Sequence, residues 1–95
     1  MLEAHVKITL KQPRNDSLTL VEDMCRLWGM RILKSGTDLH EAEIAMPVSV
    51  FKHMFKNPAT KGKHKIPSVM DIFVEEAEVL RVKPLEGKSK KDKKN

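Results

Sequence analysis

The chain has 95 residues, of which 40% are hydrophobic and 33% charged, and its formal net charge is +5. This length allows one small domain with one modest core, and no apolar stretch reaches the roughly 18 residues that cross a membrane. The start of the chain also lacks the unbroken apolar run of a secretion signal, so we expect a cytoplasmic protein with no membrane partner. Cys25 is the only cysteine, which excludes an internal disulfide and a cysteine metal cluster.

The positive charge is concentrated at the end of the sequence. Residues 83–95 contain six lysines and two acidic residues, which gives +4 of the total +5. Such a segment has too little apolar surface to fold by itself. We therefore expect a folded domain over residues 1–82 and a disordered lysine-rich tail over residues 83–95.

The first half of the chain predicts a strand and a helix. Apolar and polar residues alternate in "HVKITLK" (residues 5–11), as they do in a half-buried strand. Thr19 and Glu22 have the spacing of a capping box, which predicts a helix start. The helix carries an apolar stripe and ends at Gly29, a residue that favours the left-handed position after a helix. This stripe contains Leu20, Val21, Met24, Cys25, Leu27 and Trp28.

The second half predicts a hairpin, a helix and a last strand. Alternation on both sides of the turn sequence "SGTDL" indicates a hairpin over residues 30–46. Ser49 is the expected cap of a short helix that ends before Asn57-Pro58. A basic loop over residues 56–67 follows, and strand character begins at Val74 or Ala77 and ends at Val82. Residues 68–73 fit either a helical turn or extended chain.

This order of elements, β-α-β-β-α-β, predicts an α+β fold of the ferredoxin-like class. In that plan a four-stranded antiparallel sheet is covered by two helices on one face. The polar sides of the first and third strands suit a second sheet face that remains in water.

No motif in the sequence indicates catalysis. The loop after the first strand has neither a Cys-x-x-Cys pair nor the glycines of a phosphate-binding loop, and no nucleophile elbow or Walker loop occurs. The four histidines are too scattered for a helical ligand pair. We therefore predict no enzyme, no catalytic residue, no metal site and no cofactor.

One alternative is a small protein that associates with nucleic acid. The basic loop and the tail offer lysines for phosphate contacts that depend little on sequence. The lysines concerned are Lys56, Lys61, Lys63, Lys65, Lys88, Lys90 and Lys91. A solubilising surface is the competing interpretation of the same lysines.

The segment before the tail resembles a known family. Pro67, Ser68 and Val69, followed by Val74, Glu75 and Glu76, are similar to a segment that precedes the last strand in propeptides of subtilisin-like proteases. Those propeptides, which also occur as free inhibitors, have the same order of helices and strands. Two extra residues separate the two halves of the motif in this chain.

The resemblance implies a protein-interaction module that docks a partner with its sheet face and its C-terminal strand. The partner would be a subtilisin-like protease, with the end of the strand lying extended in the substrate cleft. The acidic residues would cap helix N-termini of the partner. The implied partner-binding residues are Glu75, Glu76, Glu78, Val82, Lys83, Pro84, Leu85 and Glu86. A further alternative is a homodimeric structural protein that self-associates through its exposed sheet or edge strands.

Overall fold

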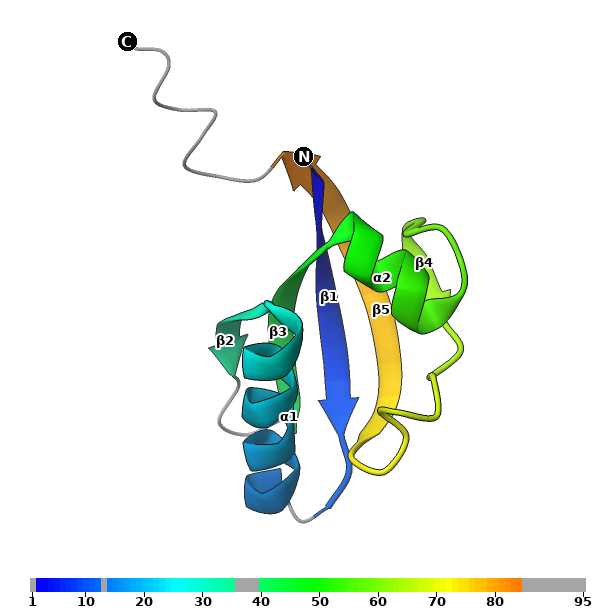
Figure 1. Ribbon diagram of the computed structural model, residues 1–95. Helices are drawn as coiled ribbons and strands as arrows, with labels where there is room; N and C mark the ends of the chain where they lie inside the picture. Colours follow the sequence, from blue (N-terminus) through cyan, green and yellow to red (C-terminus); the bar gives the residue numbers. More distant parts are fainter. Residues whose placement is uncertain (1, 13, 36–39, 85–95) are drawn as a thin grey trace, which may run out of the picture.

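The computed structural model describes residues 2–12, 14–35 and 40–84, which form one antiparallel sheet and two helices. The sheet has five strands in the order β2-β3-β1-β5-β4, so β1 lies at its centre (Figure 1). The strands are β1 (Leu2–Leu10), β2 (Arg31–Ser35), β3 (Glu41–Pro47), β4 (Gly62–His64) and β5 (Val74–Pro84), and the helices are α1 (Arg14–Trp28) and α2 (Val48–Phe55).

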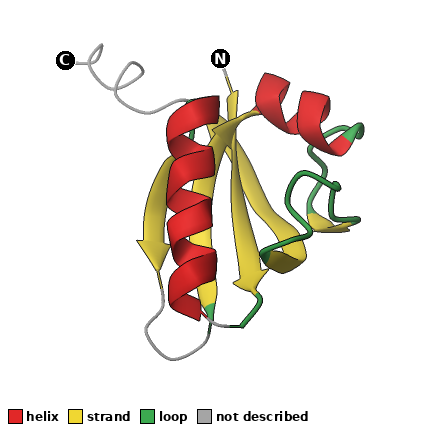
Figure 2. Cartoon of the chain, turned by 60° about the horizontal axis from the view of Figure 1, so that its bottom comes forward, coloured by secondary structure: helices red, strands yellow, loops and turns green. Residues whose placement is uncertain are grey.

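The predicted α+β class is confirmed, and the predicted strand number is wrong. Both helices cover the same face of the sheet (Figure 2). The fifth strand is β4, which lies inside the stretch predicted to be a basic loop and pairs with residues 77–79 of β5. Its three residues are too few to show alternation, so the sequence contained no strand signal there.

The core lies between the helices and the inner face of the sheet. Ala4, Val6 and Ile8 of β1 are fully buried, and Ile44 of β3 and Val79 of β5 lie beside them. Because side chains alternate along a strand, the intervening residues of β1 point to the other face. We call that second surface, which neither α1 nor α2 covers, the open face.

Helix α1 differs from its prediction at its start and in its buried stripe. It begins at Arg14, and the Thr19 hydroxyl donates a hydrogen bond to the carbonyl of Asn15 at 3.1 Å. Thr19 is therefore a mid-helix residue bonded one turn back, and the expected capping box does not form. The predicted end is confirmed, because Gly29 has a φ of 72° and the Met30 amide donates to the Cys25 carbonyl.

The buried stripe of α1 consists of Val21, Met24 and Cys25. Leu20 and Leu27, which we expected in the core, are exposed, and Leu27 is 83% accessible. These two leucines are seven residues apart and therefore share one helix face. That face points away from the sheet.

Helix α2 packs three side chains into the core: Phe51, Met54 and Phe55. It starts at Val48 after Pro47, with no side-chain cap, so Ser49 is not the cap that we predicted. Lys56 ends the helix in a left-handed conformation with a φ of 59°, and its amide donates to the carbonyl of Lys52.

Residues 68–73 form turns, which agrees with the helical turn and not with the extended chain among the two alternatives that the sequence left open. The amides of Phe73 and Val74 both donate to the Met70 carbonyl. Met70 and Phe73 are buried in the core, whereas Ile72 is 73% accessible. The segment therefore closes one end of the core with only part of its apolar side chains.

Strand β5 begins at Val74, as one of the two predicted starts had it, and continues through Lys83 and Pro84. We had assigned these two residues to the tail. Residues 85–95 lie outside the described residues, so the expected disorder of the tail stays a prediction. No helix among the described residues is long and apolar enough to cross a membrane.

The setting of Cys25 predicts an unreactive thiol. Burial, with a contribution from the Glu22 carboxylate, raises the pKa of this thiol from 9.0 to about 11. A thiol reagent at pH 8 should therefore modify Cys25 slowly in the native protein and rapidly in denaturant, because the thiolate is the reacting species. Comparable rates in both conditions would contradict the burial of this side chain.

The same pKa difference predicts a pH effect on stability. The folded thiol keeps its proton to higher pH than the unfolded thiol, so its contribution is complete below pH 9.0 and is lost between pH 9.0 and about 11. We expect the free energy of unfolding to fall more steeply over this range in the native sequence than in a Cys25→Ser variant. Chemical denaturation at several pH values measures the difference, and parallel slopes would refute it.

Candidate functional site

The open face carries a row of alternating charges that crosses the whole sheet. The strand registers place one charged residue from each strand side by side. From β2 to β4 the row consists of Lys34, Glu43, Lys7, Glu78 and Lys63. Opposite charges on neighbouring strands stabilise a sheet, so this row is favourable in every pair.

Ion pairs extend this row into a lattice along the strands. The ammonium of Lys7 lies 3.9 Å from a carboxylate oxygen of Glu41 and 3.9 Å from one of Glu78. Lys63 lies 3.5 Å from a carboxylate oxygen of Glu76. Most charged side chains of the open face are therefore paired within the chain.

One part of this lattice, at the N-terminal end of β1, is buried. Glu3 is only 2% accessible although it points to the open face, and both of its oxygens accept from the guanidinium of Arg31 at 2.8 Å. The Arg81 guanidinium donates to Nδ1 of His5 and to Glu43, each at 3.2 Å. Nδ1 of His5 is thus an acceptor, and its Nε2 faces Glu3 at 3.7 Å.

The edge of β5 is only partly covered. Residues 74–84 pair with β1 on one side, but β4 pairs on the other side only with residues 77–79. Residues 80–84 therefore have no second neighbour among the strands that the structure describes, and β5 runs past β4 towards the start of β1 (Figure 1). We call residues 80–84 the β5 edge. An unpaired strand edge is a template for another strand.

Apolar side chains lie at this end of the sheet. Val82 is opposite Ala4 and Leu2 is opposite Pro84, and all belong to the two paired strands. Val82 is 38% accessible and Leu2 is 48% accessible, so the helices do not cover the end of the inner face. The β5 edge therefore combines unpaired backbone with accessible apolar surface.

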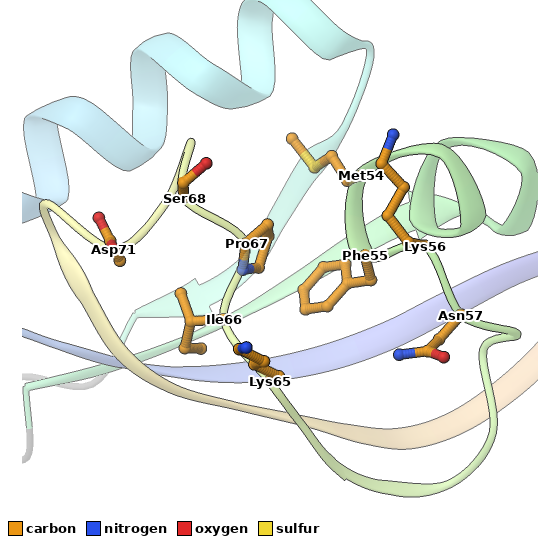
Figure 3. Close-up of a pocket in the computed structure, with 9 residues that line it drawn as sticks. All are labelled: Met54, Phe55, Lys56, Asn57, Lys65, Ile66, Pro67, Ser68 and Asp71. Carbon is orange, nitrogen blue, oxygen red and sulfur yellow. The ribbon is translucent and has the colours of Figure 1, made fainter.

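A hollow lies between the end of α2 and the turn segment of residues 68–73. Its volume is about 520 Å³. Apolar side chains form its middle, and polar side chains reach it from both sides (Figure 3). The residues are Met54, Phe55, Lys56, Asn57, Lys65, Ile66, Pro67, Ser68 and Asp71, and we call this hollow the α2 pocket.

The predicted partner-binding residues fall on two different surfaces. Glu76 and Glu78 lie on the open face and are ion-paired there, and Glu75 lies at a register shift and is exposed. Val82, Lys83 and Pro84 lie on the β5 edge, while Leu85 and Glu86 are outside the described residues.

The predicted nucleic-acid lysines that the structure describes have different surroundings. Lys63 lies on the open face in an ion pair, whereas Lys56 and Lys65 line the α2 pocket, and Lys61 is exposed just before β4. Lys88, Lys90 and Lys91 lie outside the described residues. A nucleic-acid role stays a prediction.

His5 and His40 lie far apart along β1. His5 is opposite Ala45. The carbonyl of His40 accepts from the Leu10 amide at the far end of β1, and Nε2 of its ring accepts from the side-chain amide nitrogen of Gln12 at 2.7 Å. Within residues 2–12, 14–35 and 40–84 no group of three potential ligands is close enough for a metal ion.

The α2 pocket was not predicted. Its walls come from two segments about ten residues apart, and the only hint in the sequence was the series of lysines between them.

We also compared the chain with known proteins. No protein-family model matches it, and neither the curated proteins nor the solved structures contain a significant match.

The buried carboxylate of Glu3 gives a testable consequence. Arg31→Ala removes both hydrogen bonds of the guanidinium from a carboxylate that is only 2% accessible, so we expect a loss of about 1–3 kcal/mol in the free energy of unfolding. The matched control is Arg26→Ala, which breaks an exposed pair with Asp23 on α1 and should change stability by about 0–0.5 kcal/mol. Denaturant titrations measure both, and equal losses would refute the buried role of Glu3.

Proposed function

We propose that this chain is a non-catalytic protein-interaction domain that binds an extended segment of a partner protein along the β5 edge. The observation that carries this proposal is the mismatch in length between β5, with 11 residues, and β4, with three. In such binding the backbone supplies hydrogen bonds and alternate side chains supply specificity.

The proposal includes a ferredoxin-like fold with one added strand. The strands β2, β3, β1 and β5 are neighbours in the order that the predicted β-α-β-β-α-β plan requires, and all neighbours are antiparallel. In this description β4 is an addition outside β5. It partly blocks an edge that would otherwise be open along its full length.

The open face is less suited than the edge to bind a partner. Its lysines and glutamates already form ion pairs, so a partner would have to replace these pairs or bury them. Burying charged groups costs free energy unless each finds a new partner. Backbone groups at an unpaired edge have no such competitor.

The side chains of the β5 edge indicate the chemistry of the partner strand. Arg81 and Lys83 point to the open face, opposite His5 and Glu3 of β1, and Val82 points to the inner face. Arg81 binds His5 and Glu43 through Nη1, so the other donors of its guanidinium can meet an acidic group of a partner. Cross-strand neighbours are favourable when charges are opposite and apolar groups face each other. The complementary segment therefore alternates acidic and apolar residues.

The same charges disfavour a second copy of this chain at the edge. An antiparallel pair of two β5 edges centred on Val82 places Arg81 of each copy opposite Lys83 of the other, and centring on Arg81 or Lys83 places like residues opposite each other. Like charges directly opposite destabilise a strand pair. Homodimerisation by other surfaces stays a prediction.

A model peptide tests the proposed edge. We expect a capped hexapeptide of alternating glutamate and valine to shift the backbone amide NMR signals of residues 80–84, with a dissociation constant of roughly 1 mM or below. A lysine-valine hexapeptide and a glutamate-valine peptide with one central proline should bind at least about tenfold more weakly, because they lack charge complementarity or a strand backbone.

Matched variants of the protein make this test specific. Val82→Glu adds a negative charge at the edge, whereas Val69→Glu adds the same charge at another exposed position, in the turn segment. Only Val82→Glu should weaken binding of the glutamate-valine peptide, because like charges in neighbouring strands repel. Signal shifts centred on β2, or equal effects of both variants, would overturn the proposal.

A subtilisin-like protease is the specific partner that the resemblance implies. If the β5 edge and the residues after it occupy a substrate cleft, the full chain should inhibit subtilisin, and truncation after Val82 should weaken the inhibition by at least about tenfold. A steady-state assay with a chromogenic peptide substrate measures this. Absence of inhibition would remove this partner, and equal inhibition by the truncated chain would exclude binding through the strand end.

A further inference from the structure

We propose that the α2 pocket binds a small amphipathic anion, which consists of an apolar group of about six to ten carbon atoms and one carboxylate. This site is separate from the β5 edge, and the inference does not depend on strand addition. It rests on the shape of the pocket, on its apolar middle and on the unpaired polar groups around it.

The middle of the pocket is apolar and firmly held. Phe55 is buried, stacks on the Phe51 ring at a centroid distance of 4.2 Å and contacts the His64 ring edge-on at 6.2 Å. Ile66 and Pro67 lie across from this ring (Figure 3). An apolar ligand group in the pocket would therefore meet an aromatic ring that its neighbours already fix in place.

The polar side chains around the pocket have no partners among the described residues. On the open face nearly every charged side chain is ion-paired, but no hydrogen bond or ion pair engages the side chains of Lys56, Asn57, Lys65, Ser68 and Asp71. All five belong to exposed residues. These groups are free to bind a ligand without breaking an interaction within the described part of the chain.

Charge and size define the ligand. Two lysines and one aspartate give the pocket a net charge of +1, which one carboxylate balances and a doubly charged phosphate would exceed. The volume of about 520 Å³ lies within the range of roughly 300–1,000 Å³ found for small-molecule sites. Asp71 and Ser68 lie on the opposite side from Lys56 and Asn57, and Lys65 lies between the two sides next to Ile66, so a carboxylate is favoured at the Lys56 end, away from Asp71 (Figure 3).

Two sources share this chemistry, namely a free carboxylic acid and a protein C-terminus with an apolar last residue. NMR titrations with octanoate and with N-acetyl-glycyl-leucine represent them. Octanamide, the amide of the dipeptide, and acetate each lack either the charge or the apolar group. We expect both acids to shift the signals of residues 54–57 and 65–71, and the three controls to bind at least about tenfold more weakly. The tighter of the two acids identifies the source.

Two double variants separate specific binding from general attraction to a basic protein. Lys56→Gln with Lys65→Gln removes the pocket cations, while Lys52→Gln with Lys61→Gln removes two exposed lysines that do not line the pocket. All four side chains are exposed, so both variants should fold. Affinity for octanoate should fall at least about tenfold in the first variant only. Equal losses, equal binding of octanamide, or signal shifts outside the pocket would overturn the proposal.

Discussion

The register of β1 between β3 and β5 is the constraint on which the rest of the structure depends. Side chains alternate along a strand, so a shift of one residue would exchange the two faces of β1 completely. In the observed register Val6 lies beside Ile44 and Val79 in the core, and Lys7 lies between Glu43 and Glu78 on the open face. One register therefore satisfies the hydrophobic core and the charged lattice at the same time. A shifted register of β1 is therefore unfavourable for both faces of the sheet.

Parts of this arrangement could be predicted because the signals are local. The alternation of residues 5–11 identified the central strand, Gly29 identified a helix end, and the order of elements gave the α+β class. The start of α1 was missed because a threonine with a glutamate three residues later also occurs inside helices. Leu20 and Leu27 were misplaced because a stripe that is apolar on more than one side does not reveal which side meets the sheet.

The resemblance pointed to the C-terminal strand as a partner-binding surface, but the extent of the β5 edge and the existence of the α2 pocket could not be predicted, since both depend on contacts between distant segments. The partly covered β5 edge results from the length of β4, and three residues carry no periodic signal. The α2 pocket depends on how the chain after β4 returns beside Phe55. The buried position of Glu3 likewise depends on Arg31, which is 28 residues away in the sequence. Glutamates are mostly exposed in folded proteins, so composition alone gives no indication of a buried one.

Strand β4 determines both candidate surfaces. Gly62, the first residue of β4, pairs with Val79, next to the β5 edge. Because β4 does not extend beyond this pair, residues 80–84 remain without a second neighbouring strand among the described residues. At its other end His64 pairs with Ala77 and packs against the Phe51 and Phe55 rings, which directs Lys65 and Ile66 into the wall of the α2 pocket. The two surfaces therefore lie at opposite ends of one short strand. A bound segment at the β5 edge would continue the line of β4 without displacing it, so the fold permits both ligands to be bound together.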